Sequence, residues 1–193
     1  MGNGMNKVLP ELYLGNFKDA RDRELLKQHN ITHILSIHDT AAPILEDFTY
    51  LCIPAADRSK QNLIPFFKES IGFIHESRLK GKGCLVHCVA GVSRSVTLVV
   101  AYVMTVTGRG WVESLAAVRV ARPCAGPNLG FLRQLEEFEN FHLSEYRAWL
   151  KDRYEESPFS DEEHITTLLS QKPQGPSDFL TIDRVAPLGT GST

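Results

Sequence analysis

One stretch, residues 84–95, restricts the fold of this chain more than any other. It reads Cys-Leu-Val-His-Cys-Val-Ala-Gly-Val-Ser-Arg-Ser. Residues 84–87 have the character of a short buried strand, and the run Val96–Met104 is apolar enough for a buried helix. Ser93 stands where a serine would cap that helix. The stretch therefore predicts a strand, a tight loop and a helix, an arrangement whose amides can bind an anion.

The residue types in this loop favour phosphate chemistry. Gly91 permits a backbone conformation that a Cβ would penalise, so successive amides can point at one phosphate. The amides, the helix dipole and Arg94 favour the thiolate of Cys88, which is a strong nucleophile. The planar guanidinium of Arg94 can hold two phosphate oxygens. Ser95 can donate a hydrogen bond to the sulfur and help it leave a thiophosphate. The expected phosphate-binding residues are Val89, Ala90, Gly91, Val92, Ser93 and Arg94.

This stretch has alternative interpretations besides phosphate binding. Cys88 by itself is equally typical of a buried core cysteine before an ordinary loop. The joint pattern His-Cys-x-x-Gly-x-x-Arg-Ser/Thr is more specific, because chance produces it in such a chain with a probability on the order of 10⁻⁵ to 10⁻⁴. Zinc is disfavoured because the neighbours His87 and Cys88 point to opposite faces of a strand and no second ligand pair follows. We therefore expect no metal and no cofactor.

These residues resemble a known family. His87–Ser95 is similar to the signature of the cysteine-dependent protein tyrosine phosphatases, and Ala101–Met104 resembles their dual-specificity branch. Further segments similar to small dual-specificity phosphatases occur in the same order over residues 1–149: Leu12–Gly15, Ile31–Leu35, Ile53–Asp57 and Asn128–Leu135. With residues 1–5 included, the chain resembles the small, N-myristoylated atypical type.

Four residues outside the loop have expected roles, and the resemblance implies the first of them. Asp57 stands where the family has the general acid that protonates the departing oxygen; without the family it would be taken for a solvated loop aspartate. Asn128 is expected to cap a helix and to order the loop that faces the active site. The ring of His87 is expected to hold the loop backbone by a hydrogen bond. Arg122 could reach a second anionic group, but a surface salt bridge is the expected role.

Strand and helix patterns alternate along the chain, which favours parallel pairing. Residues 8–15 are predicted to be an edge strand with Pro10 at its margin, and residues 31–37 and 48–53 to be strands of the central sheet. Helices are predicted at 19–29, 65–80, 93–107 and 111–121 and from Asn128 onward. We expect an α/β fold with a central mixed, mostly parallel sheet flanked by helices, similar to that of protein tyrosine phosphatases.

One domain and a tail account for 193 residues with 42% apolar content. Residues 1–6 are expected to form a flexible N-terminus and lipid acceptor, residues 7–150 the phosphatase domain, and residues 151–193 a tail that is partly helical and then disordered. Within the tail, Ser160 and Glu163 have the spacing of a capping box before a short helix.

The N-terminus and the cysteines predict where the protein acts. Removal of Met1 exposes Gly2, and the resemblance implies that Gly2 is myristoylated, although Asn6 replaces the usual Ser or Thr of the motif. One acyl chain binds membranes only weakly. The four cysteines lack the spacing of a disulfide scaffold and no signal peptide is visible. We expect a cytoplasmic protein with weak peripheral membrane association, and the nucleus is a further possible location.

Charge and motif together predict the function. A net charge of −2 gives no basic surface for nucleic acid. The expected protein is a dual-specificity phosphatase that hydrolyses phosphotyrosine and phosphoserine or phosphothreonine in proteins through a cysteinyl-phosphate, in kinase signalling. Its expected partners are phosphorylated proteins, with members of mitogen-activated kinase pathways implied by the resemblance. The alternatives are a catalytically weak phosphoprotein-binding scaffold and a rhodanese-like sulfur transferase, and Arg94-Ser95 argues against the latter.

Overall fold

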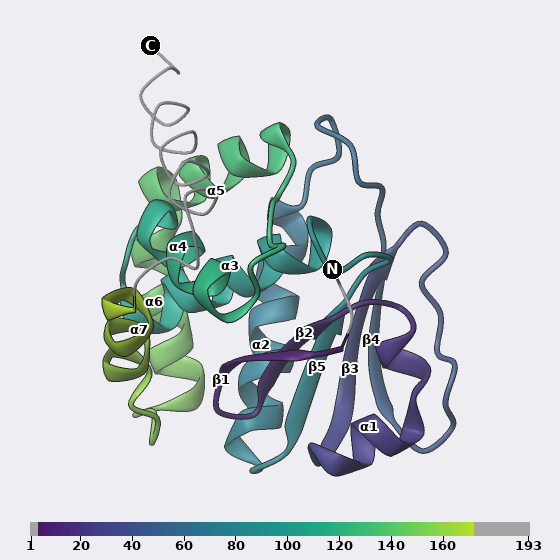
Figure 1. The fold of residues 1–193 in the computed structure, drawn as a ribbon. Helices are drawn as coiled ribbons and strands as arrows, with labels where there is room; N and C mark the ends of the chain where they lie inside the picture. Colours follow the sequence, from purple (N-terminus) through teal and green to yellow (C-terminus); the bar gives the residue numbers. More distant parts are fainter. Residues whose placement is uncertain (1–3, 172–193) are drawn as a thin grey trace.

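A single five-stranded sheet lies at the centre of the computed structural model, which describes residues 4–171 (Figure 1). The strands are β1 (Asn6–Leu9), β2 (Leu12–Gly15), β3 (Ile31–His38), β4 (Thr49–Pro54) and β5 (Gly83–His87), in the order β1-β2-β5-β3-β4. The β1–β2 pair is antiparallel, whereas β2, β5, β3 and β4 are mutually parallel. The predicted mixed, mostly parallel sheet is confirmed.

Helices fill the connections between the strands and the second half of the chain. They are the 3₁₀ helices η1 (Asp19–Arg21) and η2 (Ile64–Phe66), α1 (Arg23–Gln28), α2 (Phe67–Leu79), α3 (Arg94–Thr107), α4 (Trp111–Ala121), α5 (Leu129–Phe141), α6 (Leu143–Tyr154) and α7 (Asp161–Ser170). Local signals set several ends: the Asp22 carboxylate accepts from the Leu25 amide at the start of α1, and Gly108, with φ of 81°, ends α3.

The helices form two layers of unequal size on the sheet. α1 covers one face, where Leu26 packs with Ile34 and Leu85. α2 and the helices from α3 onward cover the other face, and α3 lies within that layer (Figure 1). Neighbouring strand residues alternate between the two cores, so that Leu85 faces α1 while Val86 faces α3. The sheet is therefore buried on both sides, as parallel strands require.

Two predictions about the N-terminal half were wrong in detail. Residues 8–15 form a hairpin of two strands rather than one edge strand, because Pro10 and Glu11 make the turn and Glu11 takes φ of 68°. The predicted helix at 19–29 is divided into η1 and α1, because Asp22 adopts an extended conformation and starts α1 as its cap. Both errors concern turn geometry, which hydrophobic patterns do not specify.

The C-terminal part of the described chain packs on the domain. The expected boundary after residue 150 falls inside α6, and α7 contacts α4 and α3, with Ile165 fully buried. Ser160 precedes α7, but its side chain makes no capping hydrogen bond; the first residue, Asp161, instead binds the buried Arg78. The disorder expected near the end, and the lipid acceptor Gly2, lie outside the described residues.

No helix among residues 4–171 is by itself both long and apolar enough to cross a membrane. α3 and α4 taken together pass that test by length and composition alone, with a bend of 118° between them.

Candidate active site

The candidate site lies at the carboxyl ends of the parallel strands. β5 runs between β2 and β3, and Cys88 follows its last residue directly. The loop of residues 88–93 then leads into α3 at Arg94. β3 and β4 end at the same edge and are followed by Asp39 and, three residues after Pro54, Asp57. Ligands commonly bind at such an edge, because the loops of several strands meet there.

Every carbonyl of residues 88–93 accepts a hydrogen bond from a residue outside the loop. The donors are His87 Nδ1 to Cys88 O (3.0 Å), Phe17 N to Val89 O (3.1 Å), Arg122 to Ala90 O (3.4 Å) and Gly91 O (2.7 Å), Gly126 N to Val92 O (2.8 Å), and Thr97 N to Ser93 O (3.0 Å). In a trans peptide the N–H points opposite to the preceding carbonyl. The amides of residues 89–94 therefore face the inside of the loop, where they can bind the oxygens of a phosphoryl group.

Gly91 is required at the apex of this loop. Its φ of 72° lies in the left-handed region. A Cβ at this position would collide with the carbonyl oxygen of Gly15 and would lie 2.6 Å from Arg122 Nη2. Because conformation and space both exclude a side chain, glycine allows the loop to close against β2.

Cys88 lies at the base of the loop with its sulfur beside a hydroxyl. The Sγ atom is 3.1 Å from Ser95 Oγ, and Ser95 is fully buried in the first turn of α3. The pair places a hydroxyl where it can donate to the sulfur, the position that the sequence predicts for Ser95. Cys88 itself is 2% exposed, so a substrate must bring its phosphorus into the loop to reach it.

The Arg94 guanidinium is buried and is held on one side. Its Nη1 donates to Asp39 Oδ1 at 2.7 Å and to the Ala55 carbonyl at 2.9 Å. The hydrogen bond from Arg94 lowers the pKa of Asp39. The buried Nε has no hydrogen-bond partner within residues 4–171. A buried donor without a partner is costly, and a phosphoryl oxygen would supply the acceptor.

Asp57 is exposed on the loop after β4 and is joined to the phosphate loop through Asn128. The Asn128 Nδ2 donates to Asp57 Oδ1 at 2.8 Å, and its Oδ1 accepts from Phe131 N at 3.0 Å and so caps α5. The Asn128 backbone amide donates to Ser93 Oγ at 2.9 Å. The prediction that Ser93 caps α3 through its side chain was wrong, because Ser93 Oγ accepts from the Asn128 amide and makes no capping hydrogen bond to α3.

Contacts with α5 hold the segment that carries Asp57. Gly130 allows the Ser59 backbone to approach α5, and a Cβ at Gly130 would overlap with it. Gln134 accepts from Leu63 N at 2.7 Å and donates to Gln61 O at 2.8 Å. These contacts hold residues 59–63 against α5. Together with the hydrogen bond from Asn128, they keep the Asp57 carboxylate near the phosphate loop.

His87 supports the loop from within the sheet. Burial lowers its pKa to about 4, so the ring is neutral at pH 7 and Nδ1–H donates to the Cys88 carbonyl. This contact agrees with the structural role inferred from the sequence. Among residues 4–171 there is no group of three or more His, Cys, Asp or Glu side chains arranged to hold a metal ion.

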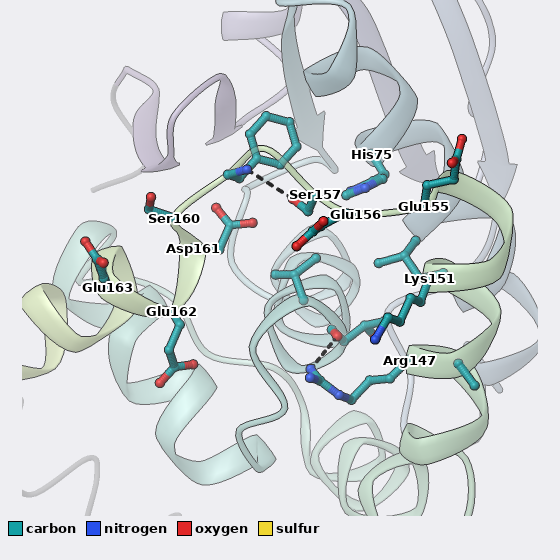
Figure 2. Close-up of a pocket in the computed structure, with 15 residues that line it drawn as sticks. His75, Arg147, Lys151, Glu155, Glu156, Ser157, Ser160, Asp161, Glu162 and Glu163 are labelled. Atoms are coloured by element: carbon teal, nitrogen blue, oxygen red, sulfur yellow. Dashed lines mark hydrogen bonds between the residues drawn. The ribbon is translucent and has the colours of Figure 1, made fainter.

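Two residues of this site were not predicted in their roles from the sequence: Asp39 was not singled out, and Arg122 was expected at the surface. Asp39 directly follows β3, a neighbour of β5, so its place at the carboxyl edge of the sheet was a usable signal. Arg122 carries no such signal. A cavity of about 850 Å³ lies elsewhere, between α6 and α7, and is lined by Arg147 and Glu163 but by no residue of the phosphate loop (Figure 2).

Comparisons with known proteins agree with this geometry. Residues 12–141 match the family described as "Dual specificity phosphatase, catalytic domain". The chain is 70% identical over 171 residues to dual specificity protein phosphatase 22-B of Danio rerio, which covers 89% of this chain and 93% of that protein. It is 62% identical over 170 residues to dual specificity protein phosphatase 22 of Homo sapiens, covering 88% and 92%.

A solved structure extends the agreement to the fold. The crystal structure of DUSP15 superposes with a TM-score of 0.77 at 54% identity, covering 81% of this chain and all of that one. The resemblance to the atypical group that includes the JNK-stimulatory phosphatase is confirmed. This chain therefore belongs to the dual specificity phosphatase family and is a protein-tyrosine and protein-serine/threonine phosphatase.

Proposed function

We propose that this phosphatase hydrolyses phosphoproteins in two steps through a cysteinyl-phosphate. In the first step Cys88 Sγ attacks phosphorus, an S–P bond forms and the P–O bond to the substrate breaks, while Asp57 gives its proton to the departing oxygen. In the second step water attacks phosphorus and loses a proton to Asp57. The S–P bond then breaks, and Ser95 Oγ–H can donate to the sulfur that leaves.

The observation that carries this proposal is the outward orientation of all the loop carbonyls. It directs the amides of residues 89–94 at the space above Cys88 Sγ, where the charge of a phosphoryl group develops. The buried Nε of Arg94 has no hydrogen-bond partner within residues 4–171 and can donate to an oxygen of the same phosphoryl group. Amides and guanidinium together can bind the phosphoryl oxygens in the ground state and in the transition state.

The surroundings of the loop support a protein substrate. Val89, Ala90 and Val92 add no charge to the loop that could hold a second phosphate, and Val89 is half exposed at its rim. Asp57 is exposed on a short segment, so the acid is accessible to phosphoserine and phosphothreonine as well as to phosphotyrosine. By resemblance, we infer that the substrates include members of mitogen-activated kinase pathways.

Replacement of the nucleophile Cys88 and of the Arg94 guanidinium tests the mechanism. Cys88→Ser should abolish turnover of an aryl phosphate and keep phosphate affinity, because the amides and Arg94 remain. Arg94→Lys should be nearly as damaging, since a single ammonium cannot bind two oxygens in one plane. Cys124→Ser is the matched control and should keep the parent rate. A Cys88→Ser rate within tenfold of the parent would contradict the mechanism, and tight phosphopeptide binding without turnover in the parent would favour the scaffold.

We also propose that Gly2 is myristoylated and that the protein exchanges between cytosol and membrane, with the nucleus as a further location. The support is the segment Gly2–Lys7 and the family resemblance. One myristoyl chain gives a binding constant of about 10⁴ M⁻¹, which permits release. Intact mass and membrane fractionation in eukaryotic cells test this. An unmodified N-terminus, or a Gly2→Ala variant that fractionates like the parent, would contradict it.

A further inference from the structure

Arg122 is a buried arginine directly behind the phosphate loop. It caps the C-terminal end of α4 and is 1% exposed, so the prediction of a surface salt bridge was wrong. A guanidinium keeps its charge at any physiological pH and cannot be buried cheaply without partners. Its hydrogen bonds therefore indicate what it does.

Two nitrogens of the Arg122 guanidinium, Nε and Nη2, hold the apex of the phosphate loop. Nε donates to Gly91 O at 2.7 Å, and Nη2 lies 3.4 Å from Ala90 O. These two neighbouring carbonyls precede the amides of Gly91 and Val92, which face the inside of the loop. Gly91 has the most permissive backbone of the loop, and a rotation of either peptide there would turn an amide away from the phosphoryl site. Arg122 opposes that rotation.

The third nitrogen of the Arg122 guanidinium, Nη1, is held by residues 4–6. Nη1 donates to Asn6 Oδ1 at 2.7 Å and to Gly4 O at 3.3 Å. The nearby Asp19 carboxylate is buried, accepts from the amides of Gly4 and Asn16, and attracts the Arg122 charge. Burial raises the pKa of Asp19, and the amide bonds and Arg122 oppose this rise. The segment that precedes β2 thus fixes the arginine from behind.

We propose that Arg122 is a positioning residue of the phosphate loop and that Asn6 sets its orientation. The inference rests on the proposed function of the loop. Arg122 touches no reacting atom; it acts through the peptides at Ala90 and Gly91, and Asn6 acts through Arg122. Asn6 therefore supports the phosphate loop through Arg122, although the two residues lie 116 positions apart in sequence. Lysine cannot replace the arginine, because one ammonium cannot reach oxygens on both sides.

Asn6 provides the cleaner test, because its replacement leaves the core intact. Asn6→Ala should lower kcat/KM for an aryl phosphate by about tenfold, the effect of losing a hydrogen bond to a charged group. Vanadate affinity should fall by a similar factor, since vanadate occupies the phosphoryl site. Asn6→Asp should restore both values, because a carboxylate oxygen accepts from the same Nη1. Lys7→Ala, an exposed neighbour on β1, is the matched control and should match the parent.

The outcomes separate this inference from the mechanism on which it rests. Parent-like kcat/KM and vanadate affinity in Asn6→Ala would overturn the inference, as would an equal loss in Lys7→Ala or no recovery in Asn6→Asp. Arg122→Lys should show the same loss in a larger degree, and the Asn6 variants decide the matter if that protein does not fold. If Cys88→Ser retains turnover, the mechanism itself fails, whatever the Asn6 variants do.

Discussion

Removal of one partner from the ion pair between Arg78 and Asp161 should cost a large part of the stability of this domain. Arg78 of α2 donates from Nη1 and Nη2 to the two oxygens of Asp161, each at 2.9 Å, and the side chains are 0% and 5% exposed. Arg78 also donates to Tyr102 OH and to Pro10 O at 2.9 Å. Asp161 opens α7 and lies beside the cavity between α6 and α7 (Figure 2). The pair thus joins the tail helix to the core.

The structure sets the size of the effect of Asp161→Asn. Burial disfavours the charge of Arg78, and the hydrogen bonds with Asp161 and Tyr102 outweigh it and raise its pKa. Removal of one partner from a buried pair costs about 3–5 kcal/mol, because the other charge stays buried. Asparagine keeps one neutral acceptor, so we expect the lower end, about 3 kcal/mol. For a chain of this size that loss corresponds to a fall in melting temperature of about 6–12 °C.

Urea unfolding monitored by circular dichroism measures this loss. Glu162→Gln is the matched control: Glu162 is the next residue and pairs with Arg109 at 2.7 Å, but it is 54% exposed, so its loss should stay below about 1 kcal/mol. Replacing both partners, by Arg78→Met with Asp161→Leu, should recover most of the loss, because no charge is then left unpaired. Equal losses in Asp161→Asn and Glu162→Gln would refute the reasoning.

Three further predictions concern the site and its support. Asp57→Asn should slow hydrolysis of an alkyl phosphoserine peptide far more than that of a fluorinated coumarin phosphate, since only the poor leaving group needs a proton; equal losses would exclude Asp57 as the acid. Burial lowers the pKa of His75 and His87 from 6.5 to about 4. As the pH falls from about 6.5 to 4, the unfolded chain therefore binds protons before the folded protein does. The free energy of unfolding should fall over this range by up to about 3 kcal/mol for each ring. Urea midpoints across that range should fall, and less steeply in His75→Gln. Peroxide should inactivate the enzyme by oxidising Cys88, with protection by vanadate, and peptide mass mapping that finds Cys88 unmodified in inactive protein would reject this.

Local patterns in the sequence were enough for the phosphate loop and most of the elements. The apolar run before Cys88 and the apolar run after Arg94 predicted β5 and α3, because burial on all sides leaves a continuous hydrophobic signal. Asn128 was predicted to cap a helix, and its side chain does so, because a cap bond spans only three residues. These features depend on neighbours in the chain, so the sequence alone determined them.

The remaining contacts of the site were decided by the tertiary structure. Asn128 meets Asp57 across 71 residues, Arg94 meets Asp39 across 55, and Arg122 meets Asn6 across 116. Asp39 and Asp57 reach the site because parallel strands carry their loops to one edge of the sheet, and Arg122 meets Asn6 because α4 packs against β1. No local pattern encodes this order of the segments. A distant contact also replaced the predicted cap at Ser93, because the Ser93 hydroxyl accepts from the Asn128 amide. The sequence by itself predicted Cys88 and the loop that follows it, and the packing of distant segments determined which side chains hold that loop in place.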